Sequence, residues 1–226
     1  MKYLNTLEGV FISRPNRFIA FVDINGQSEV CHVKNTGRCK ELLVPGVKVI
    51  LEKSTNPARK TLYDLIAVYK GENIINIDSL APNKVFGEWL EKTDFFGNIT
   101  FVKAESKYKS SRFDFYVEAN NKKMYIEIKG VTLEENGIVL FPDAPTERGI
   151  KHLNELVEAK KEGFEGYVFF VVQMKDCKCF TPNTRTHPEF AKALKDAKKN
   201  GVDIYAMNCQ VKENELEIDG FVEVRI

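Results

Sequence analysis

The stretch Ser111-Arg-Phe-Asp-Phe-Tyr-Val-Glu-Ala-Asn-Asn-Lys-Lys-Met-Tyr-Ile-Glu-Ile-Lys129 predicts a β-hairpin. Two asparagines at 120–121 stand between its alternating halves, and Asn tolerates the positive φ angles that a two-residue turn requires. In that register Asp114 directly faces Glu127. Directly opposed side chains have Cβ atoms about 4.5–5.5 Å apart. The two carboxylates would therefore repel each other unless a positive charge lies between them.

The same register predicts that the hairpin has one apolar and one polar face. The apolar face would carry Phe113, Phe115, Val117, Met124, Ile126 and Ile128. The polar face would carry Arg112, Asp114, Tyr116, Tyr125, Glu127 and Lys129. Such alternation is typical of a half-buried hairpin, in which Arg112 and Lys129 could simply neutralise the two acids.

A divalent ion is the other way to hold two carboxylates together. Mg²⁺ and Mn²⁺ prefer oxygen ligands, and such an ion polarises a phosphodiester and lowers the pKa of its bound water. Lys129 would lie on the same face, where it could contact the phosphate or the attacking water. The order Asp114, Glu127, Lys129 is that of the PD-(D/E)xK metal-dependent nucleases, with Phe113 in place of the motif's proline. The hairpin therefore predicts Mg²⁺ or Mn²⁺ on Asp114 and Glu127, with Lys129 as a catalytic group.

Residues around the hairpin add to this prediction. Glu105, nine residues before Asp114, is a candidate third metal ligand, although a lone surface glutamate is an equal alternative. Lys109 and Arg112 belong to a run of basic residues interleaved with tyrosines, which could collect phosphates and stack bases. A solvated charged face explains that run about as well.

Strands and helices alternate in the rest of the second half. A short helix capped by Asn83 is expected from Asn83 to Glu91, and strands near Ile99 to Ala104 and on both arms of the hairpin. The continuous apolar run Tyr167 to Val172 predicts a strand buried on both faces. A helix is expected from Pro188 to the residues before Gly201, with Phe190, Leu194 and Ala197 buried, and a strand over Val202 to Met207. This order predicts an α/β domain with right-handed crossovers.

A long helix is expected from about Ala144 to Lys161, with Asp143 as its N-cap. One stripe of this helix carries Arg148, Lys151, His152 and Glu155. A stripe of this kind is usually a solvated face, but it could also contact phosphates. Gly149 costs roughly 1 kcal/mol in a helix interior, which indicates close packing or close approach of a ligand.

The first 80 residues predict a small barrel. Five strand-like runs, separated by Pro and Asn-Gly turns, are Gly9 to Ser13, Phe18 to Asp23, Glu29 to Val33, Val47 to Glu52 and Thr61 to Val68. With a short helix over Asn35 to Leu43, they fit a closed barrel of the oligonucleotide-binding (OB) kind, although a sandwich or an SH3-like barrel would give a similar pattern. In the polar turn Asn35-Thr-Gly-Arg38, Arg38 and Lys40 could meet phosphate, or the turn could be a helix cap.

Composition limits the function classes. The chain has 226 residues, with 33 basic and 32 acidic side chains and a net charge of +1, so bulk charge alone cannot hold it to nucleic acid. No apolar run is long enough to span a membrane, and the first residues lack the apolar core of a signal peptide. Five cysteines without a CxxC pair favour reduced thiols and a cytoplasmic location.

The chain resembles the sugar fermentation stimulation protein A family. The resemblance rests on Asn35-Thr-Gly37, Ser111-Arg-Phe-Asp114, Tyr125-Ile-Glu-Ile-Lys-Gly-Val-Thr-Leu133 and the block Phe141-Pro-Asp-Ala-Pro-Thr-Glu-Arg-Gly-Ile-Lys-His-Leu153. It implies an OB-like barrel at residues 1–81, joined to a PD-(D/E)xK nuclease-like α/β domain at 82–226. It also implies DNA binding largely without sequence preference, and a link to the regulation of sugar (maltose) metabolism.

Carried onto this sequence, the resemblance implies a nuclease-like site of Glu105, Asp114, Glu127 and Lys129, which Arg148, Lys151 and His152 approach from the helix. Four functions follow as hypotheses: a DNA-binding protein with a divalent-metal site, an active DNA or RNA nuclease, a regulator with a vestigial nuclease fold, or a protein-interaction module. The sequence does not decide whether the chain forms homo-oligomers.

Overall fold

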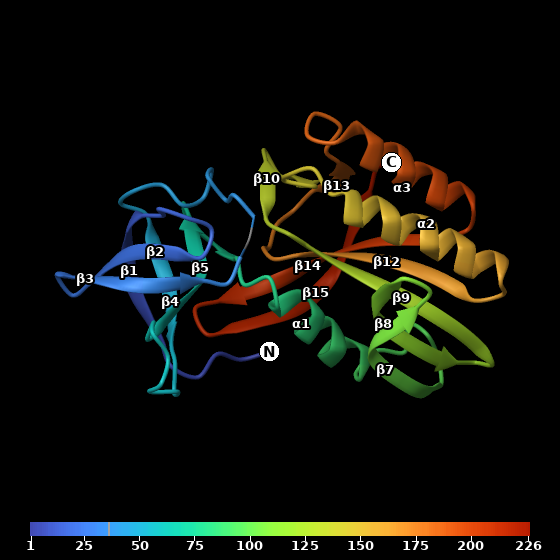
Figure 1. The fold of residues 1–226 in the computed structure, drawn as a ribbon, viewed down its shortest axis with the longest axis horizontal. Coiled ribbons are helices and arrows are strands. Elements are labelled where there is room, and N and C mark those ends of the chain that lie inside the picture. Colours follow the sequence, from blue (N-terminus) through green and yellow to red (C-terminus); the bar gives the residue numbers. More distant parts are fainter. Residues whose placement is uncertain (36) are drawn as a thin grey trace.

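The computed structural model describes residues 1–35 and 37–226. Thr36, in the middle of the Asn35–Gly37 motif, lies outside the described residues. A β-barrel forms the first third of the chain and packs beside an α/β domain that contains the three helices of the described residues (Figure 1). None of these helices is long and apolar enough to cross a membrane, as far as the described residues go.

The five predicted barrel strands are confirmed. They are β1 (Thr6–Ser13), β2 (Ile19–Ile24), β3 (Gln27–Val33), β4 (Lys48–Lys53) and β5 (Tyr63–Lys70). A parallel pairing of β3 with β5 closes the sheet on itself, which excludes the alternative of a two-sheet sandwich. A sixth strand, β6 (Asn73–Asn76), pairs with β5 and was not predicted.

The predicted helix over Asn35 to Leu43 is wrong. The described residues from Gly37 to Leu43 form bends and turns, and Cys39 has a left-handed backbone with φ 45°. Arg14 explains part of this difference. Its guanidinium donates to the carbonyls of Gly37 and Arg38, which stabilises a non-helical backbone there. A helix would have used these carbonyls for its own hydrogen bonds.

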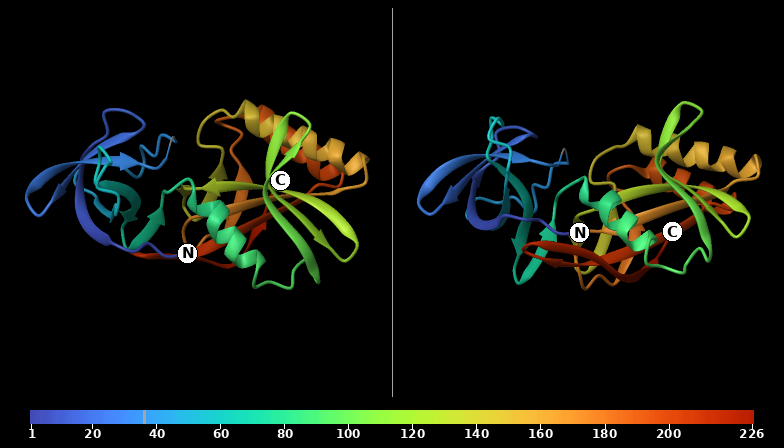
Figure 2. Two further views of the ribbon diagram at one scale, coloured as in Figure 1. Left: turned by 60° about the horizontal axis from the view of Figure 1, so that its bottom comes forward. Right: turned by 90° about the horizontal axis from the view of Figure 1, so that it is seen from below.

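The second domain is built on one nine-stranded sheet with helices on both faces (Figures 1 and 2). Helix α1 (Ala81–Leu90) covers one face, and α2 (Glu147–Lys161) and α3 (Pro188–Lys199) cover the other. In spatial order the strands are β10 (Leu133–Glu135), β11 (Ile138–Phe141), β13 (Cys179–Pro182), β15 (Glu215–Val224), β14 (Asp203–Lys212), β12 (Glu165–Val172), β9 (Lys122–Val131), β8 (Ser111–Ala119) and β7 (Ile99–Tyr108).

The central strand β12 is buried on both faces, as its apolar run predicts. It pairs in parallel with β9 on one side and β14 on the other. Phe169 and Val171 pack toward α1, whereas Val168, Phe170 and Val172 pack toward α2 and α3. On α3 the predicted buried residues Phe190, Leu194 and Ala197 are confirmed.

The hairpin of β8 and β9 has the predicted register. Asn120 and Asn121 form the turn with φ 49° and 60°, and Phe115 pairs with Ile126. The prediction of two uniform faces is wrong at Phe113, which packs with Tyr125 on the α2 side, whereas Phe115 packs on the α1 side. The ladder with β7 is interrupted between them, where Glu105 takes a left-handed backbone with φ 52°.

Both helix caps predicted in this domain are wrong. Helix α1 begins two residues before Asn83, and no side chain caps it. Helix α2 begins at Glu147, and its N-cap is Thr146, whose hydroxyl accepts from the backbone N–H of Gly149 at 3.1 Å. The predicted cap Asp143 instead accepts from the backbone N–H of Arg38 in the barrel, at 3.3 Å. In each case a tertiary contact uses the polar side chain that local sequence assigned to a cap.

Close packing explains Gly149. A Cβ atom there would lie 2.9 Å from Cγ2 of Thr146 and 3.1 Å from the ring of Phe190 on α3. We expect Gly149→Ala to lower the free energy of unfolding by roughly 1 kcal/mol, because overpacking outweighs the better helix propensity of alanine. Denaturant unfolding of this variant beside Asn154→Ala, an exposed position of α2, checks it. Equal or higher stability of Gly149→Ala would contradict the packing explanation.

Buried polar side chains join the two domains. Gln173, after β12, donates from Nε2 to Oδ1 of Asn76 at 2.8 Å and to the carbonyl of Asp78 at 3.0 Å. Asn76 in turn donates to the hydroxyl of Tyr3 at 2.9 Å. Because these groups are almost completely buried, separating the domains would leave several hydrogen-bonding groups unpaired.

Candidate functional site

Asp114 and Glu127 lie on the neighbouring strands β8 and β9, just beyond the last regular pair of the hairpin ladder. Asp114 replaces the missing backbone pairing: its Oδ2 accepts from the backbone N–H of Ile128 at 2.7 Å. Its Oδ1 accepts from the side-chain amide of Asn83 on α1, also at 2.7 Å. The carboxylate of Asp114 is thus fixed from two elements, and Asn83 has a positioning role that its sequence position did not reveal.

Glu127 is buried, with 3% of its surface exposed. Its Oε1 lies 2.5 Å from Nδ1 of His152 on α2 and also accepts from Lys129. Its Oε2 is buried without a hydrogen-bond partner among the described residues. A buried carboxylate oxygen without a partner is costly, so this atom is a site at which a cation would be stabilised.

The two carboxylates have opposite pKa shifts. Burial and the nearby charge of Glu127 raise the pKa of Asp114. Burial also acts to raise the pKa of Glu127, but Lys129 and His152 outweigh it and hold that pKa below its ordinary value. The ionised form of Glu127 is therefore stabilised, whereas that of Asp114 is destabilised by burial and by the charge of Glu127. A divalent cation between them would stabilise both carboxylates.

The residues at this site supply part of the coordination that a hard divalent ion needs. Two carboxylates are suitable ligands for Mg²⁺ or Mn²⁺, and water or a phosphate oxygen commonly completes the coordination of Mg²⁺. Residues 1–35 and 37–226 contain no cluster of three or more His, Cys, Asp or Glu side chains with metal-site geometry.

Glu105, the predicted third ligand, does not join the two carboxylates. It lies opposite Asp114 in the β7–β8 register, but its side chain is exposed and accepts from Nη1 of Arg112 at 3.0 Å. The left-handed backbone at Glu105 was not predictable, because only glycine and asparagine commonly adopt it.

A basic pocket of about 420 Å³ lies beside His152. Its lining brings together four of the predicted nucleic-acid residues, Arg112, Arg148, Lys151 and His152, with Lys107, Ser110 and Ser111. The predicted contact Lys109 does not line it, because its ammonium group is paired with Glu158 on α2 at 3.0 Å and with the C-cap residue Glu162 at 2.9 Å. Arg38 lies in the barrel, at a separate pocket.

His152 connects this pocket to the carboxylates. Nε of Arg148 donates to Nε2 of His152 at 3.3 Å, so that Nδ1 carries the proton that faces Glu127 when the imidazole is neutral. The ring is buried and packs edge-on against Phe113. The sequence prediction that this stripe of α2 is solvated is therefore wrong for His152 and for its neighbour Glu155.

Glu155 was not among the predicted site residues. It is buried, and its Oε1 accepts from the hydroxyl of Ser110 at 2.8 Å, which fixes the loop between β7 and β8 at the pocket. Its spacing of three residues from His152 was the available signal, because both then lie on one face of the helix.

The prediction of reduced thiols is confirmed, and two histidines away from the site have structural roles. All five cysteines are free thiols. His187 is the N-cap residue of α3 and accepts from the backbone N–H of Thr146 at 3.2 Å, so it joins the starts of α2 and α3. In the barrel, Nδ1 of His32 lies within hydrogen-bond distance of Oδ1 of Asp64, at 3.0 Å.

A closed OB-type barrel followed by an α/β domain, with paired carboxylates on a hairpin, defines a class of two-domain proteins. Family models place the chain within this class. One, described as the SfsA N-terminal OB domain, matches residues 12–77. The other, described as the sugar fermentation stimulation protein RE domain, matches residues 80–215.

The chain belongs to the sugar fermentation stimulation protein (SfsA) family, which confirms the resemblance found in its motifs. It is 58% identical over 226 residues to the homolog from Ruminiclostridium cellulolyticum, and the match covers 100% of each chain. It is also 58% identical to the homolog from Clostridium beijerinckii, with 99% of each chain covered. A solved structure of Pyrococcus furiosus SfsA in complex with Ca²⁺ is similar over 100% of both chains, with a TM-score of 0.91 and 27% identity.

Proposed function

We propose that the protein binds DNA largely without sequence preference, and that Asp114 and Glu127 hold Mg²⁺ or Mn²⁺ against a backbone phosphate. The observation that carries this proposal is the buried, unpartnered Oε2 of Glu127 beside Asp114. In support, the solved relative from P. furiosus was in complex with Ca²⁺, another cation that prefers oxygen ligands.

The basic pocket suits a phosphate backbone. Lys107, Arg112, Arg148 and Lys151 line it, and no acidic side chain does so among the described residues. Contacts to phosphates position a protein on DNA but carry no sequence information. A strand held here would lie next to the carboxylate pair, since His152 lines the pocket and also contacts Glu127.

The proposed link to the regulation of sugar metabolism rests on the family description alone. This link needs no sugar-binding site, because a protein that binds DNA could act on the genes of sugar metabolism through that DNA. The link belongs to the proposal because two relatives that are 58% identical to the chain carry the name sugar fermentation stimulation protein homolog.

Hydrolysis of the phosphodiester is the second candidate function, favoured by the position of Lys129. A divalent ion, when bound, would polarise the phosphodiester and lower the pKa of an attacking water. Lys129 is held beside Glu127 and could stabilise the negative charge that develops on the phosphate. His152 keeps Glu127 ionised and oriented, and so acts as a positioning residue.

Incubation with labelled nucleic acid tests both candidates. We expect wild-type protein to bind single- and double-stranded DNA in a salt-dependent manner with Mg²⁺ or Mn²⁺ present. If the chain is a nuclease, cleavage falls by at least about 10²-fold in both Asp114→Ala and Lys129→Ala, because each loses an electrostatic stabiliser of the reaction. RNA substrates run in parallel establish which nucleic acid is preferred.

Three results separate the possibilities. Cleavage lost in both variants establishes the nuclease, and salt-dependent binding without cleavage supports the DNA-binding protein alone. No binding to any of these nucleic acids, even at low salt, would contradict the proposal. Lys192→Ala removes an exposed cation of α3 that does not line the pocket, and it is the control for a general loss of positive charge.

A further inference from the structure

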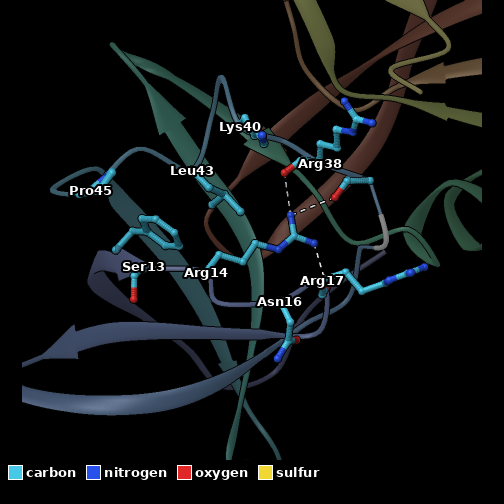
Figure 3. Close-up of a pocket in the computed structure, with 10 residues that line it drawn as sticks. Ser13, Arg14, Asn16, Arg17, Arg38, Lys40, Leu43 and Pro45 are labelled. Carbon is cyan, nitrogen blue, oxygen red and sulfur yellow. Dashed lines mark hydrogen bonds between the residues drawn. The ribbon is translucent and has the colours of Figure 1, made fainter. Parts of the chain in front are cut away.

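A second basic pocket, of about 540 Å³, lies in the barrel (Figure 3). It is formed by the end of β1, the segment that follows it and the turns after β3. Of its lining residues, Arg38 was predicted to bind nucleic acid, and Lys40 was named with it as able to meet phosphate. The other two cations, Arg14 and Arg17, were not among the predicted residues.

Arg14 forms the frame of this pocket. Its Nη1 donates to the carbonyls of Gly37 at 2.9 Å and Arg38 at 2.8 Å. Its Nη2 donates to those of Arg17 at 2.8 Å and Asn35 at 2.6 Å. Figure 3 shows the guanidinium between the two segments that it joins. Its positive charge is thus held in place by neutral carbonyl groups, and no carboxylate of the described residues pairs with it.

The other cations of the pocket are free to meet an anion. Arg17, Arg38 and Lys40 are exposed, and within residues 1–35 and 37–226 none of them forms an ion pair. No acidic side chain of the described chain lines the pocket. By contrast, Lys109 and Lys34 elsewhere are each paired with two or more carboxylates. Four clustered cations without counter-charges favour a ligand with a phosphate group.

The opposite wall of the pocket is apolar. Phe11, Leu43 and Pro45 line it, and their side chains offer no hydrogen-bond partners. At the rim, the guanidinium of Arg17 lies 5.7 Å from the ring centroid of Phe18, an exposed aromatic side chain on which a base could stack. Phosphate-binding cations beside an apolar wall together fit a nucleotide better than a bare phosphate.

Two residues that line the pocket, Gly37 and Arg38, contact Asp143 of the second domain. The backbone N–H of Arg38 donates to Oδ2 of Asp143, and Gly37 packs so closely on this carboxylate that a Cβ atom would lie 2.7 Å from it. Asp143 lies four residues before α2, the helix that carries Arg148 and His152. A strand anchored in the barrel pocket could therefore continue toward the carboxylate site.

We propose that the barrel pocket binds one nucleotide unit, with its phosphate on Arg17, Arg38 and Lys40 and its base against the apolar wall. The nucleotide can be free or part of a single strand, since both present the same phosphate and base. The strand-bound form rests on the proposed function; binding of a free nucleotide does not.

Titration calorimetry with full-length protein tests the proposal. The probes are 5′-TMP, thymidine and a 12-residue thymidine oligonucleotide, without divalent ions. We expect 5′-TMP to bind and thymidine to bind at least about tenfold more weakly, because charge-assisted hydrogen bonds to phosphate are lost. The double variant Arg17→Ala/Lys40→Ala should weaken 5′-TMP binding at least tenfold. Both side chains are exposed, so the fold should persist.

The oligonucleotide distinguishes the two sources of the nucleotide. The double variant should reduce the slope of log K against log salt by about 1.4, from about 0.7 per lost phosphate contact in single strands. A loss of oligonucleotide affinity in this variant, with no 5′-TMP binding in either protein, supports a pocket that takes nucleotides only within a strand. Wild-type affinity of the double variant for both probes, or thymidine binding as tight as 5′-TMP, would overturn the proposal.

Two single variants complete the design. Lys192→Ala removes an exposed cation from α3 and should bind both probes like wild type. Asp114→Ala should bind 5′-TMP like wild type, because the barrel pocket does not use the carboxylate pair. These barrel measurements therefore still decide whether the pocket binds a nucleotide, even if the proposed metal site fails its own test.

Discussion

Asp114→Asn is expected to raise the melting temperature of the metal-free protein while it abolishes the response to Mn²⁺. Burial and the charge of Glu127 raise the pKa of Asp114, so at neutral pH its ionised form reduces the free energy of unfolding. Asparagine removes that charge and can still accept from the backbone N–H of Ile128. A residue that destabilises the ligand-free protein is expected at a ligand-binding site.

The change in stabilisation by Mn²⁺ is expected to be larger than the change in the stability of the metal-free protein. At an Mn²⁺ concentration of about 100 Kd, wild-type protein should gain about 2.7 kcal/mol of unfolding free energy, and Asp114→Asn should gain almost none. Thermal unfolding with and without Mn²⁺ measures both quantities. Glu105→Gln is the matched control, because it removes the exposed carboxylate that is paired with Arg112 and should keep the full response. An Asp114→Asn protein that is still stabilised by Mn²⁺ would show that the ion binds elsewhere.

Asp64→Ala is expected to destabilise the protein by about 3 kcal/mol, which lowers the melting temperature by about 6–12 °C. Asp64 is 3% exposed in the barrel strand β5. Its carboxylate accepts from Nη1 and Nη2 of Arg59 at 2.9 and 2.6 Å, and lies 3.2 Å from Nζ of Lys34. Truncation would leave Arg59 next to a cavity without its counter-charge, and Lys34 with only Glu52 and Asp78 as partners among the described residues.

The same ion pairs predict an acid sensitivity. Burial acts to raise the pKa of Asp64, but Arg59, Lys34 and His32 outweigh it and lower that pKa from 3.8 to about 2. Because the folded-state pKa is lowered, the contribution of Asp64 is complete at neutral pH and is lost as the pH falls from about 4 toward 2. The loss is on the order of 2 kcal/mol.

Unfolding of wild type and Asp64→Ala as a function of pH checks both statements. The difference in unfolding free energy between the two proteins should shrink as the pH falls below 4. Glu223→Ala removes an exposed partner of Arg225 and should change stability by less than about 1 kcal/mol. A difference between wild type and Asp64→Ala that does not depend on pH would contradict the ion-pair account.

Local sequence signals predicted the hairpin and the barrel strands well. Two consecutive asparagines fix a two-residue turn, so the register of Asp114 and Glu127 followed directly from the sequence. The alternation of side chains along β8 was predicted less well, because the ladder is interrupted at Glu105 and Phe113 then packs on the other side of the sheet. A left-handed glutamate has no sequence signature.

Tertiary contacts decided the features that local reasoning missed. Asn83 and Asp143 both resemble helix caps, yet one fixes Asp114 and the other contacts the barrel. His152 and Glu155 resemble a solvated stripe, but the long β7–β8 hairpin covers them. The four carbonyls that hold Arg14 come from segments up to 24 residues away, so its role in the barrel pocket required the folded chain.

The most direct test of the central claim is the affinity for a single-stranded DNA oligonucleotide with EDTA or with Mn²⁺, measured for wild type and Asp114→Asn at one salt concentration. We predict that Mn²⁺ strengthens binding by wild type, because the ion joins the Asp114–Glu127 pair to a phosphate, and leaves the affinity of Asp114→Asn unchanged. An equal effect of Mn²⁺ on both proteins, or no effect on wild type, would contradict the claim that these carboxylates hold a divalent ion at the nucleic acid.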